Sequence, residues 1–214
     1  IKNWMNNFFK KYFNLYIKNK AYKKRNSYSQ WGEDKYISKF FENKSFGFYV
    51  DIGCFHPIRY SNTCLLFNKG WNGINIDAIP GGMKLFKKLR PRDINLELGI
   101  GKKHGIIDFY IFNDPAINTF SKELAEKRNH SKNEFFLKKV VKVKVERLET
   151  ILKDYLSENE IDILNVDVEG LDLDVLESND WSKYRPKFVL AEILDYKFDD
   201  LHKSPVVKFM VKNK

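Results

Sequence analysis

The sequence predicts an α/β fold, in which a mostly parallel sheet carries helices on both of its faces. Short apolar segments of strand length alternate with segments of helical spacing, as they do in βαβ units. Apolar residues make up 43% of the 214 residues, which is enough to fill the core of one domain and too many for a disordered chain. The strands of this sheet are expected at residues 48–51, 73–77, 94–98, 161–166 and 188–194.

Helices are expected between and after these strands. They are predicted at residues 31–41, 62–68, 82–89, 122–128, 150–156 and 173–176. Two added strands are expected at 105–112 and 140–145, and the second reads VVKVKV, which alternates as a half-buried strand does. Residues 205–211 fit either a helix or one strand.

The beginning of the chain has the pattern of a basic amphipathic helix. Trp4, Phe8, Tyr12 and Tyr16 recur at helical spacing among lysines. We therefore expect an N-terminal helix at residues 1–26, followed by one domain at 27–214. Packing of this helix on the domain is the first interpretation, and peripheral contact with a membrane through residues 1–25 is the second.

The positive charge of the chain is concentrated at its two ends. The net charge is +10, but residues 1–25 contain eight Lys or Arg and no acid, and residues 197–214 contain five Lys and two Asp. The body between the ends is therefore close to neutral. This distribution argues against a nucleic-acid groove through the body, and we expect no specific nucleic-acid partner.

Membrane spans and metal-binding cysteines are not predicted. The sequence shows neither a run of about 18 apolar residues nor a cleavable signal peptide, so a cytoplasmic location is expected, with contact at the inner membrane face as the alternative. Cys54 and Cys64 lack the spacing of a zinc site and are expected to be buried free thiols.

Acids and a glycine follow the predicted strands, at the edge where ligands bind open parallel sheets. These residues are Asp51 and Gly53, then Asp77, then Asp167 and Glu169, and finally Glu192. One such acid alone would be more typical of a helix cap or a solvated loop. Together they favour a functional site, because like charges gathered at one edge do not serve stability.

Residues 49–57, YVDIGCFHP, begin like a nucleotide-binding turn but lack the glycines of GxGxxG. Gly53 would allow a ligand to approach the backbone closely, and Asp77 stands where an acid binds ribose hydroxyls in nucleoside-binding units. Phe55 and His56 occupy the space that a pyrophosphate needs. A cofactor with a ribose and no phosphate, such as S-adenosylmethionine, therefore fits better than NAD.

Several longer segments carry a family resemblance when they are taken together and in order. They are SYSQWGEDKYI (27–37), YVDIGCFHPIRYSNTCLLFNKGWNGINID (49–77), RPRDINLELGIG (90–101), NTFSKELA (118–125), VKVERLETIL (143–152), IDILNVDVEGLDLDVL (161–176) and FVLAEIL (188–194). The chain resembles the FkbM family of S-adenosylmethionine-dependent methyltransferases. The resemblance implies a Rossmann-like class I methyltransferase fold and O-methylation of a hydroxyl on a sugar, glycan or related natural product.

The resemblance also implies roles for individual residues. Its cofactor contacts would come from Asp51, Gly53, Asp77, Gln30 and Asn62. Gln30, with Glu33 and Asp34, would close over the cofactor or the acceptor, and the alternative is an acidic first turn of a helix. His56 is a further pocket candidate. Sheets of this type usually end with two more strands in an antiparallel hairpin, so the last C-terminal strands are expected to be missing and the sheet edge to be open.

Methyl transfer to a sugar hydroxyl requires alignment of the acceptor oxygen and removal of its proton. The catalytic candidates are Asp167, Glu169 and His56. Asp167 and Glu169 are two positions apart, so in an extended chain they point the same way, and with Glu192 they would form a Mg²⁺ site. Alternatively, Glu169 caps a helix that opens at Gly170, Glu192 holds a loop donor, and a base acts without metal.

Two other functions stay open at this point. The chain would be an RNA or protein methyltransferase if its basic ends recruit a polymer. It would be a non-catalytic module if residues 1–25 bind a membrane or a partner while the cofactor site is inactive. The sequence does not identify the acceptor or the oligomeric state.

Overall fold

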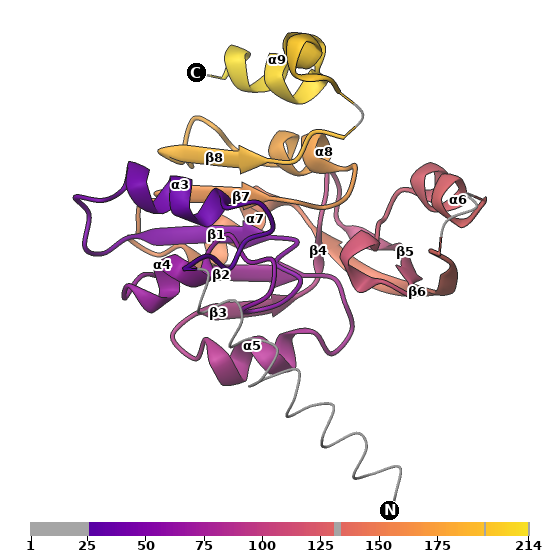
Figure 1. Ribbon diagram of the computed structural model, residues 1–214, viewed down its shortest axis with the longest axis horizontal. Helices are drawn as coiled ribbons and strands as arrows, with labels where there is room; N and C mark the ends of the chain where they lie inside the picture. The colour runs from indigo at the N-terminus through magenta and orange to yellow at the C-terminus, as the bar shows by residue number, and fades with distance from the viewer. Residues whose placement is uncertain (1–25, 131–133, 195, 214) are drawn as a thin grey trace, which may run out of the picture. The chain divides into compact units, whose positions relative to one another are not determined.

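The computed structural model describes residues 26–130, 134–194 and 196–213 (Figure 1). The chain divides into two compact units, and the boundary separates residues up to 46 and 56–71 from residues 47–55 and those after 71. The smaller unit contains α3 (Glu33–Phe40) and α4 (Cys64–Asn68). The basic helix predicted at residues 1–26 falls almost wholly outside the described residues and stays a prediction.

The larger unit is built on a five-stranded parallel sheet (Figure 1). Its strands are β1 (Phe48–Ile52), β2 (Asn72–Asp77), β3 (Ile94–Glu97), β7 (Ile163–Val166) and β8 (Phe188–Ala191). Their order is β3-β2-β1-β7-β8, and every neighbouring pair is parallel. The predicted α/β fold is therefore confirmed. The chain moves outward from β1 through β2 to β3, and β7 and β8 extend from the other side of β1, so the strand order reverses between β1 and β7.

One face of the sheet is apolar and packs against helices. Alternate residues of β1, β2 and β7 point to this face, where α7 (Leu148–Tyr155) and α8 (Asp172–Glu177) contribute further apolar side chains. The most buried members of this core are Val50, Ile52, Ile74, Ile76, Leu148, Leu152, Leu164, Val166, Val175 and Leu176. Burial of side chains of this size stabilises the fold by about 1.5–3 kcal/mol each.

The other face is polar where β2, β1 and β7 lie side by side. Asn75, Asp51 and Asn165 occupy one row across these strands, and all three are buried. The side-chain amide of Asn165 donates to the Asp51 carboxylate at 2.8 Å. Two residues earlier on β1, the Tyr49 hydroxyl donates to the Asp93 carboxylate at 2.5 Å. These polar groups are tolerated at this depth because they bond to one another.

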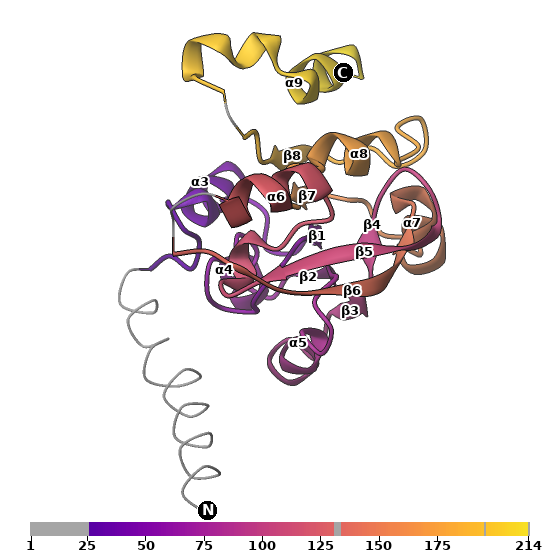
Figure 2. The same cartoon turned by 90° about the vertical axis from the view of Figure 1, so that its right-hand side faces the viewer.

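After β3 the chain enters a second, three-stranded sheet. It consists of β4 (Gly99–Ile100), β6 (Leu137–Glu146) and β5 (Gly105–Phe112), in that order, and β5 runs antiparallel to β6 (Figure 2). The strand predicted at 94–98 is thus shorter, because the chain leaves the parallel sheet after Glu97. Gly99 permits this crossing, since a Cβ there would lie 2.6 Å from the ring of Phe120.

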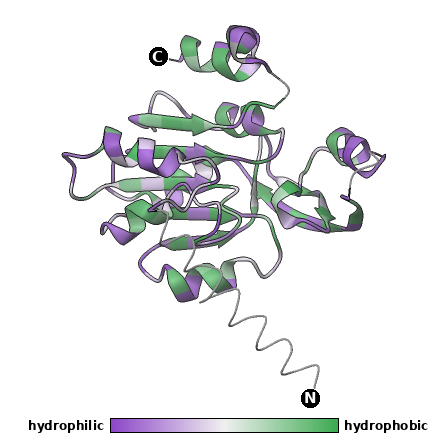
Figure 3. Ribbon diagram, in the orientation of Figure 1, coloured by the Kyte–Doolittle hydropathy of each residue, from purple (hydrophilic) through white to green (hydrophobic). Residues whose placement is uncertain are grey.

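The segment between β5 and β6 carries the short helix η2 (Pro115–Ile117) and the helix α6 (Lys122–His130). Figure 3 shows mainly hydrophilic colours on α6 and hydrophobic ones along β7 and β8. Such a helix contributes little to an apolar core, so its side chains are available for polar contacts elsewhere. We call residues 113–130, which contain η2 and α6, the inserted segment.

The remaining helices lie at the margins of the sheet. α5 (Met83–Leu89) buries Met83 and Phe86 against Cys54, which is a buried thiol like Cys64. After β8 the described residues form η3 (Phe198–Lys203) and α9 (Pro205–Lys212), so the helix is the correct alternative for 205–211. Proline at the first helical position favours that start. Within the part of the chain that is described, no helix is long and apolar enough to cross a membrane.

Candidate active site

A cavity opens at the carboxyl edge of the parallel sheet, where the strand order reverses. The space that it encloses is about 480 Å³ with the open mouth included. The apolar part of its lining is Ile52, Phe55, Ile76, Ala78, Ile79, Leu98, Ile100, Phe109, Pro115, Ala116, Phe120 and Val168. Its polar side chains are Asp77, Asn118, Asp167 and Glu169, and Gly53 and Gly99 expose backbone to it. The cavity therefore combines an apolar slot with acids at separate points.

Gly53 lies in this lining directly after β1. A Cβ on Gly53 would come 1.7 Å from the carbonyl oxygen of Asp167, and its φ of +78° favours glycine as well. The backbone N–H of Gly53 donates to the Ile76 carbonyl at 2.9 Å. The backbone after β7 thus requires a glycine at this position, and the close approach of a ligand to Gly53 stays a prediction.

Asp77 ends β2, and its carboxylate faces the cavity. One oxygen accepts the backbone N–H of Ile79 at 2.7 Å, and the other accepts that of Phe55 at 2.8 Å. Burial raises the pKa of Asp77 to about 6, although the two backbone hydrogen bonds favour the charged form and lower the pKa. Each carboxylate oxygen retains a lone pair for a further donor, so the residue can accept hydroxyl groups from a ligand.

Asp51 is placed differently from Asp77. It lies within β1, is buried beneath the edge and bonds to Asn165, and it is not part of the cavity lining. Its charge acts on the site through space, since it contributes to the raised pKa of Asp77 and of the Cys54 thiol. A direct contact of Asp51 with the cofactor stays a prediction.

The structure brings the three remaining carboxylates together. Asp167 and Glu169 follow β7 and line the cavity, and Glu192 follows β8. One oxygen of each lies within 4.8 Å of the others. Burial raises the pKa of Glu192 to about 8, and the charge of Asp167 contributes next. We call Asp167, Glu169 and Glu192 the carboxylate cluster.

Glu192 also holds an unbonded atom inside this cluster. Its Oε2 is buried and has no hydrogen-bond partner among the residues that the structure describes. The alternative in which Glu192 holds a loop donor is therefore not supported at this oxygen. A buried carboxylate oxygen without a donor favours the protonated acid or an external partner.

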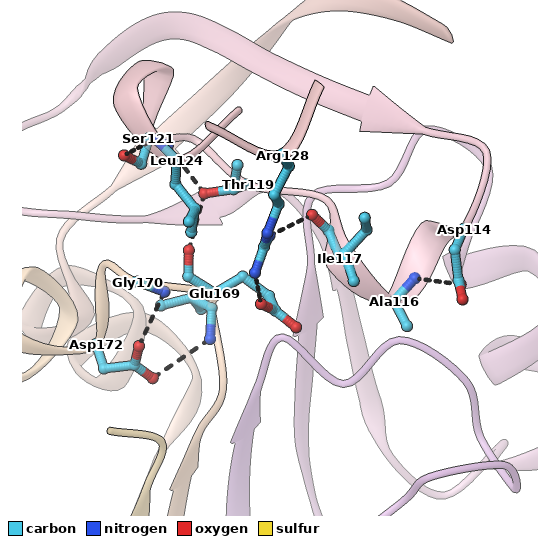
Figure 4. A network of polar contacts seen from close by, with 11 residues as sticks. Asp114, Ala116, Ile117, Thr119, Ser121, Leu124, Arg128, Glu169, Gly170 and Asp172 are labelled. Atoms are coloured by element: carbon cyan, nitrogen blue, oxygen red, sulfur yellow. Dashed lines mark hydrogen bonds and ion pairs between the residues drawn. The ribbon is translucent and has the colours of Figure 1, made fainter. Parts of the chain in front are cut away.

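Glu169 is fixed from two sides by the inserted segment (Figure 4). Its carboxylate accepts Nη2 of Arg128 at 2.5 Å, and its backbone carbonyl accepts the Thr119 hydroxyl at 2.9 Å. Its φ of +56° is unusual for a residue with a side chain, a strain that is typical of functional loops. Asp172, the first residue of α8, accepts the N–H groups of Val168 and Gly170. The start of α8 has no side-chain cap hydrogen bond, so Glu169 does not take the capping role considered above.

The candidates in the smaller unit make local contacts. Nδ1 of His56 accepts the backbone N–H groups of Ile58 and Arg59, both at 3.0 Å, so this nitrogen holds a turn. Asp34 is buried and accepts the Tyr28 N–H at 2.6 Å, and Glu33 accepts the Trp31 N–H at 2.9 Å. These bonds agree with an acidic first turn of α3. Gln30 is exposed and Asn62 is half-buried, and their roles stay predictions, as does a catalytic role for His56.

Sequence reasoning missed two polar residues of the inserted segment. Asn118 is 7% exposed, and its Oδ1 accepts the Phe112 N–H at 2.9 Å, which fixes the orientation of its amide. Its Nδ2 is buried without a partner among the described residues, and the residue lines the cavity. Arg128 is the second. The only signal in the sequence was the segment 118–125, which carries part of the family resemblance but gives no role.

The comparison with protein families identifies the family of the chain. The profile of the Methyltransferase FkbM domain matches residues 47–206. The chain belongs to this family. The matched range contains the parallel sheet, the cavity and the whole carboxylate cluster of this FkbM methyltransferase. Curated proteins and solved structures gave no match. Membership implies S-adenosylmethionine as the methyl donor.

Proposed function

We propose that this FkbM methyltransferase transfers a methyl group from S-adenosylmethionine to a hydroxyl of a sugar, glycan or related natural product. One observation carries the proposal: Asp77, which suits a ribose, and the carboxylates Asp167 and Glu169, which suit a hydroxyl acceptor, line the same cavity. The cavity lies at the switch point of the sheet, where α/β enzymes bind their ligands.

The lining fits the nucleoside part of the methyl donor. Asp77 can accept both ribose hydroxyls, and Ile79, Leu98 and Ile100 offer apolar surface for a purine ring. Phe55 lines the cavity at the point where dinucleotide-binding folds have a glycine beside the pyrophosphate. This arrangement supports a cofactor without phosphate and disfavours NAD.

The chemistry assigns a simple task to the protein. S-adenosylmethionine supplies an activated methyl group on a sulfonium, so the C–S bond breaks with its electron pair left on sulfur as the C–O bond forms. The chain must hold the acceptor oxygen in line and accept its proton. Asp167 lines the cavity and is partly exposed, and we assign it the role of base. Glu169 is held by Arg128, and Nδ1 of His56 accepts two backbone N–H groups of a turn.

A divalent cation fits the carboxylate cluster poorly. Mg²⁺ requires oxygen ligands at about 2.0–2.1 Å in octahedral geometry. The three oxygens are close enough to one another to attract a cation, but the Glu169 carboxylate is already paired with the Arg128 guanidinium. A second positive charge beside a divalent ion is unfavourable, and no step of the proposed reaction uses a metal.

The proposal is tested in two stages. Calorimetry with S-adenosylmethionine and S-adenosylhomocysteine should show binding by the parent chain and a large loss with Asp77→Ala, whereas no binding by the parent chain would overturn the proposal. Transfer of a radioactive methyl group is then measured with free sugars, nucleotide sugars and polyols as acceptors. Asp167→Asn should lower the rate by about 10²- to 10⁴-fold and leave binding of S-adenosylhomocysteine intact.

The other functions are outcomes of the same measurements. Labelling of RNA or of a basic protein in place of the sugars, with steep loss at higher salt, would move the assignment to a polymer acceptor. Sedimentation with anionic vesicles in the absence of cofactor binding would favour the non-catalytic module.

A further inference from the structure

We propose that Arg128 is the resident cation of the carboxylate cluster, held where a divalent ion would otherwise bind, and that the site therefore works without metal. Arg128 is then a positioning residue that acts through Glu169. The inference concerns the charge balance of the cluster. Its test uses a metal ion alone, so it can fail or succeed independently of the proposed methyl acceptor.

The cluster needs a counter-charge. Asp167, Glu169 and Glu192 present oxygens within 4.8 Å of one another, and Asp172 follows as the first residue of α8. Carboxylates at such separations repel each other when ionised, and burial strengthens the repulsion. Proteins relieve this strain by protonation, by a bound metal or by a basic side chain. Only the last of these leaves a permanent positive charge that belongs to the chain.

Arg128 meets the requirement for a permanent and fixed charge. Its guanidinium stays protonated at all physiological pH values and bonds in a planar, directed geometry. Nη2 donates to Glu169 at 2.5 Å, and Nη1 donates to the Ile117 carbonyl at 2.6 Å (Figure 4). The side chains of Arg128 and Glu169 are 17% and 18% exposed, so water screens the pair only weakly.

The backbone around Arg128 holds it in this position. The Ser121 hydroxyl accepts the Leu124 N–H at 3.2 Å in the first turn of α6, and the Thr119 hydroxyl accepts the Ser121 N–H at 3.0 Å. Thr119 also donates to the Glu169 carbonyl, so the loop after β7 is joined both to the residues before α6, through Thr119, and to the last turn of α6, through Arg128. Arg128 therefore lies on a segment that is itself held against the loop after β7, and this fixes the position of its guanidinium beside Glu169.

The arrangement leaves too few ligands for a divalent ion. With Glu169 paired, at most the Asp167 and Glu192 carboxylates of the cluster remain for an ion, and a nearby guanidinium repels the ion. Removal of the guanidinium would release three carboxylates, a donor set that suits hard cations. Metal affinity should thus appear when Arg128 is neutralised, which is the opposite of what loss of a ligand does.

The test measures Mn²⁺ binding by calorimetry, with Mn²⁺ as a spectroscopically visible substitute for Mg²⁺. The parent chain should bind Mn²⁺ at least tenfold more weakly than Arg128→Met, which has a side chain of similar length and no charge. Arg128→Lys should resemble the parent chain, and Arg128→Met combined with Glu169→Gln should lose the gained affinity. Arg185→Met is the matched control, because Arg185 is exposed and bonds to the Asn213 carbonyl.

Two results would overturn the inference. One is tight Mn²⁺ binding by the parent chain, which needs no variant to be folded. The other is an Arg128→Met protein that still binds S-adenosylhomocysteine, or still melts cooperatively, and yet gains no affinity for Mn²⁺. In the transfer assay, EDTA should leave the parent chain unaffected, and Mg²⁺ should partly restore the rate of Arg128→Met. Restoration by metal is a readout that a merely structural arginine would not give.

Discussion

A Cβ atom on Gly53 would lie 1.7 Å from the carbonyl oxygen of Asp167. The loops that follow β1 and β7 therefore touch through their backbones at the point where the strand order of the sheet reverses. Gly53 and Asp167 both line the cavity. Part of the cavity lining thus depends on a contact between two loops that are more than a hundred residues apart in the chain.

Gly53→Ala should destabilise the protein by roughly 3 kcal/mol or more. The methyl group would collide with fixed backbone, and the φ of +78° is strained for alanine. Denaturant unfolding measures the loss. Gly105→Ala is the control, because a Cβ there has no atom within 4 Å and the change should be close to neutral. Equal stabilities of the two variants would contradict the described contact.

Affinity for S-adenosylhomocysteine should fall as pH drops below about 6. Asp77 has a pKa of about 6, and only its ionised form accepts hydroxyl hydrogens at both oxygens. At pH 5 roughly a tenth of the carboxylate is ionised, so calorimetry should show binding up to about tenfold weaker than at pH 7.5. In Asp77→Asn the binding should be weak at both pH values. A pH profile that is the same in the parent chain and in Asp77→Asn would assign the ribose contact elsewhere.

The acids at the sheet edge could be predicted because their position depends on little more than the strand pattern. Asp77, Asp167 and Glu192 each follow an apolar segment, and the carboxyl ends of parallel strands share one edge. Asp51 shows the limit of this reasoning. Asp51 lies within β1 and not in the loop after it. Its side chain therefore points to a face of the sheet, where it bonds to Asn165.

The partners of these acids could not be predicted in the same way. Arg128 and Asn118 reach the site from the inserted segment, whose position depends on the second sheet and on contacts such as Thr119 with Glu169. A hydrophilic helix such as α6 gives no period that reveals which of its residues faces the site. Contacts between residues that are tens of positions apart in the chain depend on the tertiary structure, and the local sequence pattern does not predict them.

Asn118→Asp should weaken ligand binding while the fold is kept. The carboxylate can still accept the Phe112 N–H, but it replaces the buried Nδ2 donor of a residue that lines the cavity. Loss of one hydrogen bond corresponds to roughly threefold to tenfold in affinity or in the apparent constant for the acceptor. Calorimetry with S-adenosylhomocysteine and the transfer assay measure the two possibilities separately. If both stay at the level of the parent chain, Nδ2 bonds to neither ligand.

Glu192→Gln should stabilise the protein increasingly as the pH rises. The pKa of Glu192 is about 8 in the folded chain and lies near 4.5 when it is unfolded, so the folded state holds the proton more tightly. The resulting stability is complete below about pH 4.5 and is lost as the pH rises through 8. Glutamine does not ionise and escapes this loss.

The measurement is thermal unfolding between pH 5 and pH 9. The melting temperature of Glu192→Gln should exceed that of the parent chain by a margin that grows over this range and levels off above pH 9. Glu123→Gln, at an exposed position on α6, provides the comparison for the chemical change alone. A margin that is constant with pH would mean that Glu192 is ionised throughout this range and would contradict its raised pKa.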